Sequence, residues 1–172
     1  MYTTAAAEPF WNFSIQVYST PLVADLSLSL QDKYGFDVNV LLLCLWLAQE
    51  RCLTLDQETM HELRRGVAEL NENLVWPIRR ARRWVKASTD KAFQSLENAE
   101  RRKFYESLQL TELKGERFVQ SALIECLSTV GEIMSKTPEA AARISLENYR
   151  EAIAAPEISK TDLEMLVVRV LS

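Results

Sequence analysis

A run of nine apolar residues at positions 40–48 constrains the fold of this chain more than any other feature. A run of this kind is typical of a buried strand or of a helix that is buried on every side. Asp37 precedes it and can cap a helix, and the leucine-rich run continues into the polar segment 49–51. These features favour a helix at 38–50. A helix that is apolar all round is usually a central one, so we place it at the centre of the fold.

Apolar residues recur at intervals of three or four along most of the remaining chain, which indicates amphipathic helices. Leu22, Leu26 and Leu30 show this spacing, and so do Leu146 and Tyr149. The chain has only 4 glycines in 172 residues, whereas all-β folds use glycine and proline freely in turns. We therefore predict an all-α fold, a compact single-domain helical bundle of about seven helices around the central helix 38–50.

Proline and glycine mark several of the predicted helix boundaries. Thr20 and Thr137 each precede a proline, a pair that is typical of a helix start, and Gly35 suits a helix end. Pro77 interrupts the apolar pattern of residues 57–86. The sequence leaves open whether 57–86 is one kinked helix or two helices that meet near Asn73.

The first residues carry neither a basic leader nor a long apolar run, so we read residues 1–7 as a flexible tail rather than a signal peptide. The nine-residue apolar run is also far shorter than the roughly 20 residues of a membrane span. The sequence therefore predicts a cytoplasmic protein without a membrane partner, and residues 8–172 are expected to form a single helical domain.

Two strings in the first half carry a family resemblance: PFWNFSIQVYSTPLVADLSLSLQDKYGFDVNVLLLCLWLA, which begins at Pro9, and WPIRRARRWVK, which ends at Lys86. On these strings, the segment 9–86 resembles a family of proteobacterial conserved hypothetical proteins of unknown function. The resemblance implies a cytoplasmic helical protein, in which 8–86 is a family-like core and 91–172 adds further helices. It implies no activity and no catalytic residues.

A basic helix is the first candidate site. Its cations and one flanking tryptophan are Arg79, Arg80, Arg82, Arg83, Lys86 and Trp84. Like charges one turn apart repel each other, so something should offset them. One reading is pairing within the chain, for example with Glu97 and Glu100, or plain solvation. The other is an anionic partner, because the planar guanidinium group grips carboxylate or phosphate at two points. The cluster 101–103 would extend the patch if the two helices are adjacent.

The polar turn 31–39, between two strongly apolar helices, is the second candidate. Asp37 and Asn39 at a helix start have an ordinary structural role, which is to satisfy the free amides of the first turn. A functional interpretation would place Asp32, Asp37 and Asn39 around a small ligand at this helix end.

Metal and catalytic signatures are missing from the sequence. His61 is the only histidine, and Cys44, Cys52 and Cys126 lack the C-x-x-C spacing of structural zinc sites. Glycine-rich phosphate loops and the G-x-S-x-G elbow do not occur. We therefore predict no metal site, no cofactor and no catalytic residues, and lean against an enzyme.

The function that the sequence favours is that of an interaction or adaptor protein, which binds an anionic partner through its basic helix face. An acidic protein surface is the expected partner, and nucleic acid is less favoured because the net charge is −4 and the pI about 5.2. A homodimer through an exposed tryptophan or leucine stripe is a further possibility. The alternative is a helical enzyme or small-ligand binder with a polar pocket at the 31–39 turn.

Overall fold

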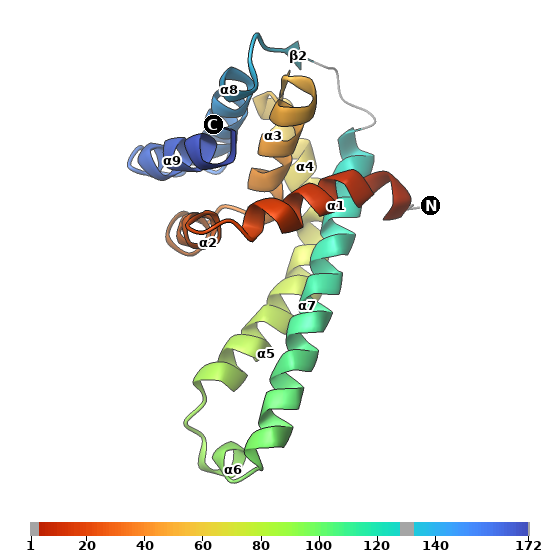
Figure 1. Cartoon of the computed structure of the whole chain (residues 1–172), viewed down its shortest axis with the longest axis vertical. Coiled ribbons are helices and arrows are strands. Elements are labelled where there is room, and N and C mark those ends of the chain that lie inside the picture. The colour runs from red at the N-terminus through yellow and green to blue at the C-terminus, as the bar shows by residue number, and fades with distance from the viewer. Residues whose placement is uncertain (1–3, 128–132, 172) are drawn as a thin grey trace. The chain divides into compact units, whose positions relative to one another are not determined.

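The computed structural model describes residues 4–127 and 133–171, and most of this part of the chain is helical (Figure 1). The α-helices are α1 (Thr4–Tyr18), α2 (Val23–Tyr34), α3 (Val38–Arg51), α4 (Gln57–Leu70), α5 (Trp76–Ala87), α6 (Lys91–Gln94), α7 (Asn98–Leu127), α8 (Pro138–Ala152) and α9 (Ser159–Leu171). Two short strands, β1 (Leu53–Thr54) and β2 (Ile133–Met134), pair antiparallel, with Leu53 opposite Met134. The predicted all-α fold is confirmed.

The chain divides into two compact units, each described here by itself. Unit 1 comprises the described residues of Met1–Gly66 and Gln120–Ser172, and unit 2 is Val67–Val119. The expected single domain at 8–172 stays a prediction. The boundary that the sequence suggested between 86 and 91 falls inside unit 2.

Helix α3 is the core of unit 1, as the sequence predicts. Asp37 caps it, because the Asp37 carboxylate accepts a hydrogen bond of 2.8 Å from the backbone N–H of Asn39. Every residue from Val40 to Leu45 is buried. Helices α1, α2, α8 and α9 and strand β1 all pack on α3. This all-round packing is why α3 needs no polar face.

Two boundaries at the N-terminal end differ from the prediction. Helix α1 begins at Thr4 and buries Ala7, so residues 4–7 are helical rather than part of the predicted tail 1–7, and Pro9 lies inside the helix. Thr20 does not cap α2. The N-cap is Leu22, in the left-handed region at φ 72°, and the N–H of Val23 donates to the carbonyl of Thr20. Thr20 is thus part of a turn before the helix.

The stretch 57–86 contains two α-helices, α4 and α5, which meet near Asn73. A π-helical segment, Asn71–Val75, joins α4 to α5, so the helical path continues while the residues after it shift register. Pro77 lies in the first turn of α5, directly after the π-helical segment. Gly115 of α7 lies against this segment: a Cβ atom at Gly115 would be 3.2 Å from Cγ2 of Val75.

An ion-pair cluster joins α8 to α9 in unit 1. Glu147 accepts a hydrogen bond of 2.9 Å from Arg150 and forms an ion pair of 2.8 Å with Lys160. The hydrogen bond from Arg150 lowers the pKa of Glu147 to about 2; partial burial opposes this, and the hydrogen bond from Lys160 supports it.

Acid should therefore weaken unit 1 through Glu147. Because the folded pKa lies below the ordinary value, the contribution of this carboxylate to stability is present above about pH 4.5 and is lost as the pH falls towards about 2. We expect Glu147→Gln to lower the free energy of unfolding at pH 7 and to flatten its decline over that interval. Urea unfolding at a series of pH values measures both. An unchanged slope in the variant would show that Glu147 does not contribute.

Candidate anion-binding site

The basic helix α5 turns two of its arginines towards α7 inside unit 2. Nε of Arg79 is 3.0 Å from Oε1 of Glu112, and Nη2 of Arg79 pairs with Glu116. Arg82 grips the same Glu112 with two nitrogens, Nε and Nη2, the latter at 3.1 Å from Oε1. All four side chains are at most 22% exposed.

The electrostatics of this cluster favour the charged forms of Glu112, Arg79 and Arg82. Burial alone would raise the pKa of Glu112, but the hydrogen bonds from Arg82 and Arg79 outweigh it, and the pKa is lowered. Burial likewise opposes the charge of Arg79, yet Glu116 and Glu112 hold its pKa above the ordinary value. Pairing within the chain thus accounts for Arg79 and Arg82. Their partners are Glu112 and Glu116 rather than the expected Glu97 or Glu100.

The other predicted residues of α5 are exposed. Arg80, Arg83 and Lys86 all lie at the surface, and Trp84 is 53% exposed. Neither Arg80 nor Lys86 forms an ion pair within the described part of the chain. The structure therefore separates the six predicted residues into two that hold unit 2 together and four that face outward.

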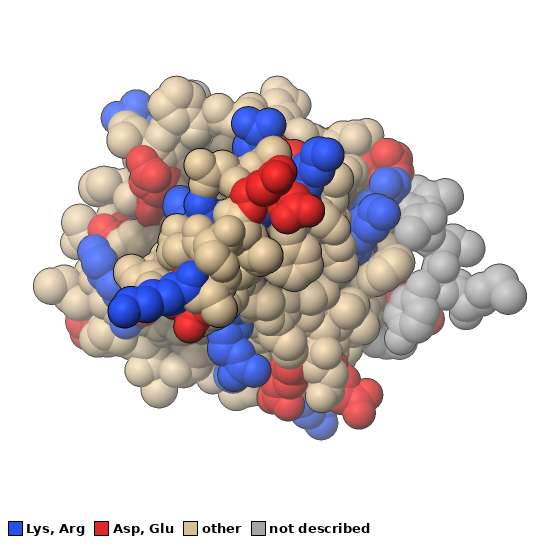
Figure 2. Space-filling model, turned by 90° about the horizontal axis from the view of Figure 1, so that it is seen from below, with Lys and Arg blue, Asp and Glu red and all other residues tan. Residues whose placement is uncertain are grey.

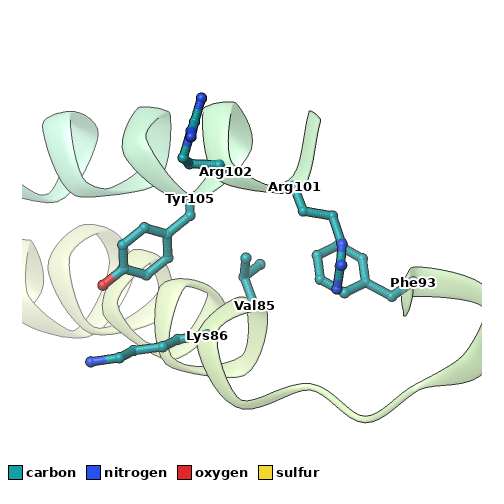
Figure 3. Close-up of a pocket in the computed structure, with 6 residues that line it drawn as sticks. All are labelled: Val85, Lys86, Phe93, Arg101, Arg102 and Tyr105. Atoms are coloured by element: carbon teal, nitrogen blue, oxygen red, sulfur yellow. The ribbon is translucent and has the colours of Figure 1, made fainter. Parts of the chain in front are cut away.

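A small pocket lies where the end of α5 meets α6 and the start of α7 (Figure 3). Its volume is about 240 Å³, and its lining is Val85, Lys86, Phe93, Arg101, Arg102 and Tyr105. In Figure 3 the Arg101 and Tyr105 side chains point from α7 towards α6 and α5, whereas Lys86 and Arg102 extend outward at the rims. The helices are thus adjacent here, and Arg101 and Arg102 extend the basic patch.

No described carboxylate pairs with Arg101 in this pocket. Its two terminal nitrogens donate to the side-chain oxygens of Gln94 and Asn98, which are neutral amides. Its guanidinium carbon lies 5.9 Å from the ring centroid of Phe93, a cation–π contact. Its Nε atom is buried and has no hydrogen-bond partner among the described residues. The guanidinium group is therefore fixed in position while its charge remains uncompensated.

Charge is unevenly distributed between the two units. Residues 67–119 contain eleven Lys and Arg against eight Asp and Glu, a net charge of +3, whereas the rest of the chain contains nine against sixteen, a net charge of −7. Figure 2 shows several Lys and Arg side chains on one face of the molecule, with some Asp and Glu among them. Unit 2 is therefore basic, although the net charge of the whole chain is mildly acidic.

The second candidate, the 31–39 turn, uses its polar groups for contacts within unit 1. Asp37 caps α3, and its backbone N–H donates to the hydroxyl of Tyr149 at 2.7 Å. Asn39 is buried, and its side-chain oxygen accepts a hydrogen bond of 3.0 Å from Gln120. Asp32 is exposed and accepts a hydrogen bond of 3.2 Å from Gln31. A ligand pocket formed by Asp32, Asp37 and Asn39 stays a prediction.

His61 and the three cysteines lie in different environments. His61 is exposed on α4, Cys44 is fully buried in α3, and burial raises the pKa of its thiol. The sulfur of Cys126 lies against Gly66, where a Cβ atom would collide with it.

Within residues 4–127 and 133–171, no three His, Cys, Asp or Glu residues form a group that could hold a metal ion. No helix of the described chain is long and apolar enough to cross a membrane.

Sequence reasoning missed four residues of unit 2: Glu112, Glu116, Phe93 and Tyr105. A signal for the two glutamates exists. The apolar pattern of α7 weakens at 110–115, where Glu112 and Gly115 take positions that face α5 and the π-helical segment. A carboxylate at an inward helical position, opposite an arginine-rich helix, is the pattern that indicates a buried ion pair.

Comparison with known proteins identifies the family. The search of curated proteins found no match, and neither did the search of solved structures. A family model described as "Protein of unknown function (DUF2390)" matches residues 9–123, about two thirds of the 172 residues. The match extends well beyond the segment 9–86 and covers all of unit 2. The chain therefore belongs to the DUF2390 family of proteins of unknown function.

Proposed function

We propose that this chain is a non-enzymatic interaction protein that binds an anionic partner through the basic end of unit 2. We define the basic end as residues 80–103, which contain eight Lys and Arg against three Asp and Glu. The observation that carries the proposal is that Lys86 and Arg101 line one pocket and neither has a carboxylate partner among the described residues.

The contrast with Arg79 and Arg82 supports the choice of this end. An anion that approached those two arginines would have to displace Glu112, which already holds them. At the basic end an anion would meet cations whose mutual repulsion it relieves. Among the described residues, Arg102 forms one ion pair, an exposed contact of 3.7 Å with Glu106, and a pair of this kind contributes little.

A bacterial source and a cytoplasmic location are part of the proposal. The bacterial source rests on the family resemblance of residues 9–86. The location is supported by Cys44 and Cys52, which are free thiols, as is usual in a reducing compartment.

Charge reversal at the basic end tests the proposal. We expect the pair Lys86→Glu and Arg102→Glu to elute from immobilised heparin, a general polyanion, at clearly lower salt than the unchanged protein. Each phosphate- or sulfate-like contact that is lost reduces the dependence on salt. The matched control is Lys33→Glu with Lys136→Glu, two exposed lysines of unit 1 that change the net charge equally. Equal effects of the two pairs would contradict a localised site.

A further inference from the structure

We infer that the basic end of unit 2 binds single-stranded nucleic acid. This inference rests on the proposed function and names its partner. Cations alone would bind an acidic protein surface as well as a nucleic acid. The observation that distinguishes the two partners is the set of aromatic rings placed among the cations, because unpaired bases stack on such rings and acidic side chains do not.

Two aromatic side chains line the pocket, and a third packs against one of them from α5. Phe93 and Tyr105 line it, and the ring of Trp84 lies 5.1 Å from that of Phe93. Trp84 and Phe104 are both more than half exposed. Large rings at the surface lose contact with water when a base stacks on them, so they favour a ligand that presents flat faces.

The pocket has flat side-chain groups inside and cations at its rims. Phe93, Tyr105 and the Arg101 guanidinium group form flat surfaces inside it, while Lys86 and Arg102 extend outward at its rims (Figure 3). A volume of about 240 Å³ is smaller than the roughly 300–1,000 Å³ of pockets for drug-sized ligands, so it suits one base or one phosphate group. A base stacked inside and phosphates at the rims match this arrangement.

A second exposed column on α5 extends the surface along the helix. Trp76, Arg80 and Trp84 are spaced four residues apart and therefore share one face, and all three are exposed. The two tryptophans are about 12 Å apart along the helix axis, from the rise per residue. An aromatic ring, a cation and a second ring therefore alternate along one face of the helix. This order suits an extended single strand, whose bases would stack on the rings while its phosphates contact the cation.

Duplex nucleic acid fits these features less well than a single strand. In a duplex the bases are already stacked on each other, so the rings around Trp84 would have nothing to bind. The phosphates of a duplex would still attract Lys86 and Arg102. A preference for single strands over duplex is therefore the direct consequence of the aromatic side chains.

Fluorescence anisotropy with a labelled oligo(dT) strand, an oligo(U) strand, a DNA duplex and labelled polyglutamate tests the inference. We expect one of the single strands to bind more tightly than both the duplex and polyglutamate. Trp84→Ala should weaken single-strand binding by about 5- to 100-fold, the loss typical of one stacked base. The apolar control is Ile158→Ala, a residue of unit 1 that is 70% exposed, and it should change nothing.

Two further measurements do not depend on the stability of the Trp84 variant. Bound single strand should quench the tryptophan fluorescence of the unchanged protein, because Trp76 and Trp84 would stack with bases. The pair Lys86→Ala and Arg102→Ala should reduce the slope of log K against log salt by about 1.4, two phosphate contacts at 0.7 each.

The outcomes separate the inference from the proposed function. Equal binding of polyglutamate and single strands, with no effect of Trp84→Ala, would overturn the nucleic-acid inference and leave an acidic protein as the partner. If the duplex and the single strands bound equally tightly, the inference that unpaired bases stack on the aromatic rings would be wrong. If no anion binds at all, the proposed function fails as well.

Discussion

Replacement of Glu112 by alanine should destabilise unit 2 by about 3 kcal/mol, which is the low end for breaking a buried ion pair. Glu112 holds both Arg79 and Arg82, and its side chain is only 11% exposed. Its removal takes away the carboxylate that the two largely buried guanidinium groups share, although Glu116 still pairs with Arg79 and the Tyr105 side chain still hydrogen-bonds with Arg82. Uncompensated buried charge, rather than the loss of one favourable contact, is the physical reason for the size of the effect.

Hydrogen exchange resolves this effect by region. Peptides from α5 and from residues 104–119 should lose protection in Glu112→Ala, while peptides from α3 should not, because α3 belongs to unit 1. The matched control is Glu106→Ala, which breaks only the exposed 3.7 Å pair with Arg102 and should cost less than about 1 kcal/mol. Equal exchange in both variants would show that the buried cluster does not stabilise unit 2.

The features that the sequence predicts well are local. Asp37, Gly35 and Thr137 each act within one helical turn: Asp37 and Thr137 cap the helices that follow, and Gly35 ends α2 at φ 79°. The apolar run at 40–48 predicts burial on every side, and all its residues except the half-buried Trp46 are buried. Local hydrogen bonds and helical periodicity decide these features, so neighbouring residues suffice to predict them.

The features that the sequence leaves undecided depend on residues far apart in the chain. Arg82 and Glu112 are 30 residues apart, and the paired strands β1 and β2 are separated by about 80. The π-helical segment was foreseen only as a disturbance near Asn73. Helical periodicity carries no information on which helix lies opposite another, so it could not show which arginines are neutralised.

The candidate site was predicted in part for the same reason. The expectation that cluster 101–103 extends the basic patch depended on two helices being adjacent, and Lys86 and Arg101 do line one pocket. Phe93 and Tyr105 carry no motif, and spacing along their own helices does not connect them with Trp84. Only the packing of α5, α6 and α7 brings these rings together.

Unit 1 should lose about 4 kcal/mol of stability when Tyr149 is replaced by alanine, close to the cost of truncating a buried aromatic residue. Tyr149 is 1% exposed, and its ring meets that of Phe36 edge to face at 5.1 Å. Its hydroxyl also accepts the hydrogen bond from the backbone N–H of Asp37. The substitution therefore removes packing, an aromatic pair and the partner of a partly buried amide in one step. Urea unfolding measures the loss.

Tyr149→Phe separates these contributions and bears on the role of the 31–39 turn. It keeps the ring and removes only the hydroxyl, so we expect a loss of about 1–2 kcal/mol from the Asp37 amide that is left without its acceptor. A turn that serves as a scaffold depends on this contact, because the hydroxyl of Tyr149 on α8 fixes the residue that caps α3. Two results together would instead identify the turn as a ligand site. The first is that Tyr149→Phe leaves the stability unchanged. The second is that a metabolite from a screening panel raises the melting temperature of the unchanged protein but not that of Asp32→Ala. A loss of stability without such ligand dependence identifies it as structural.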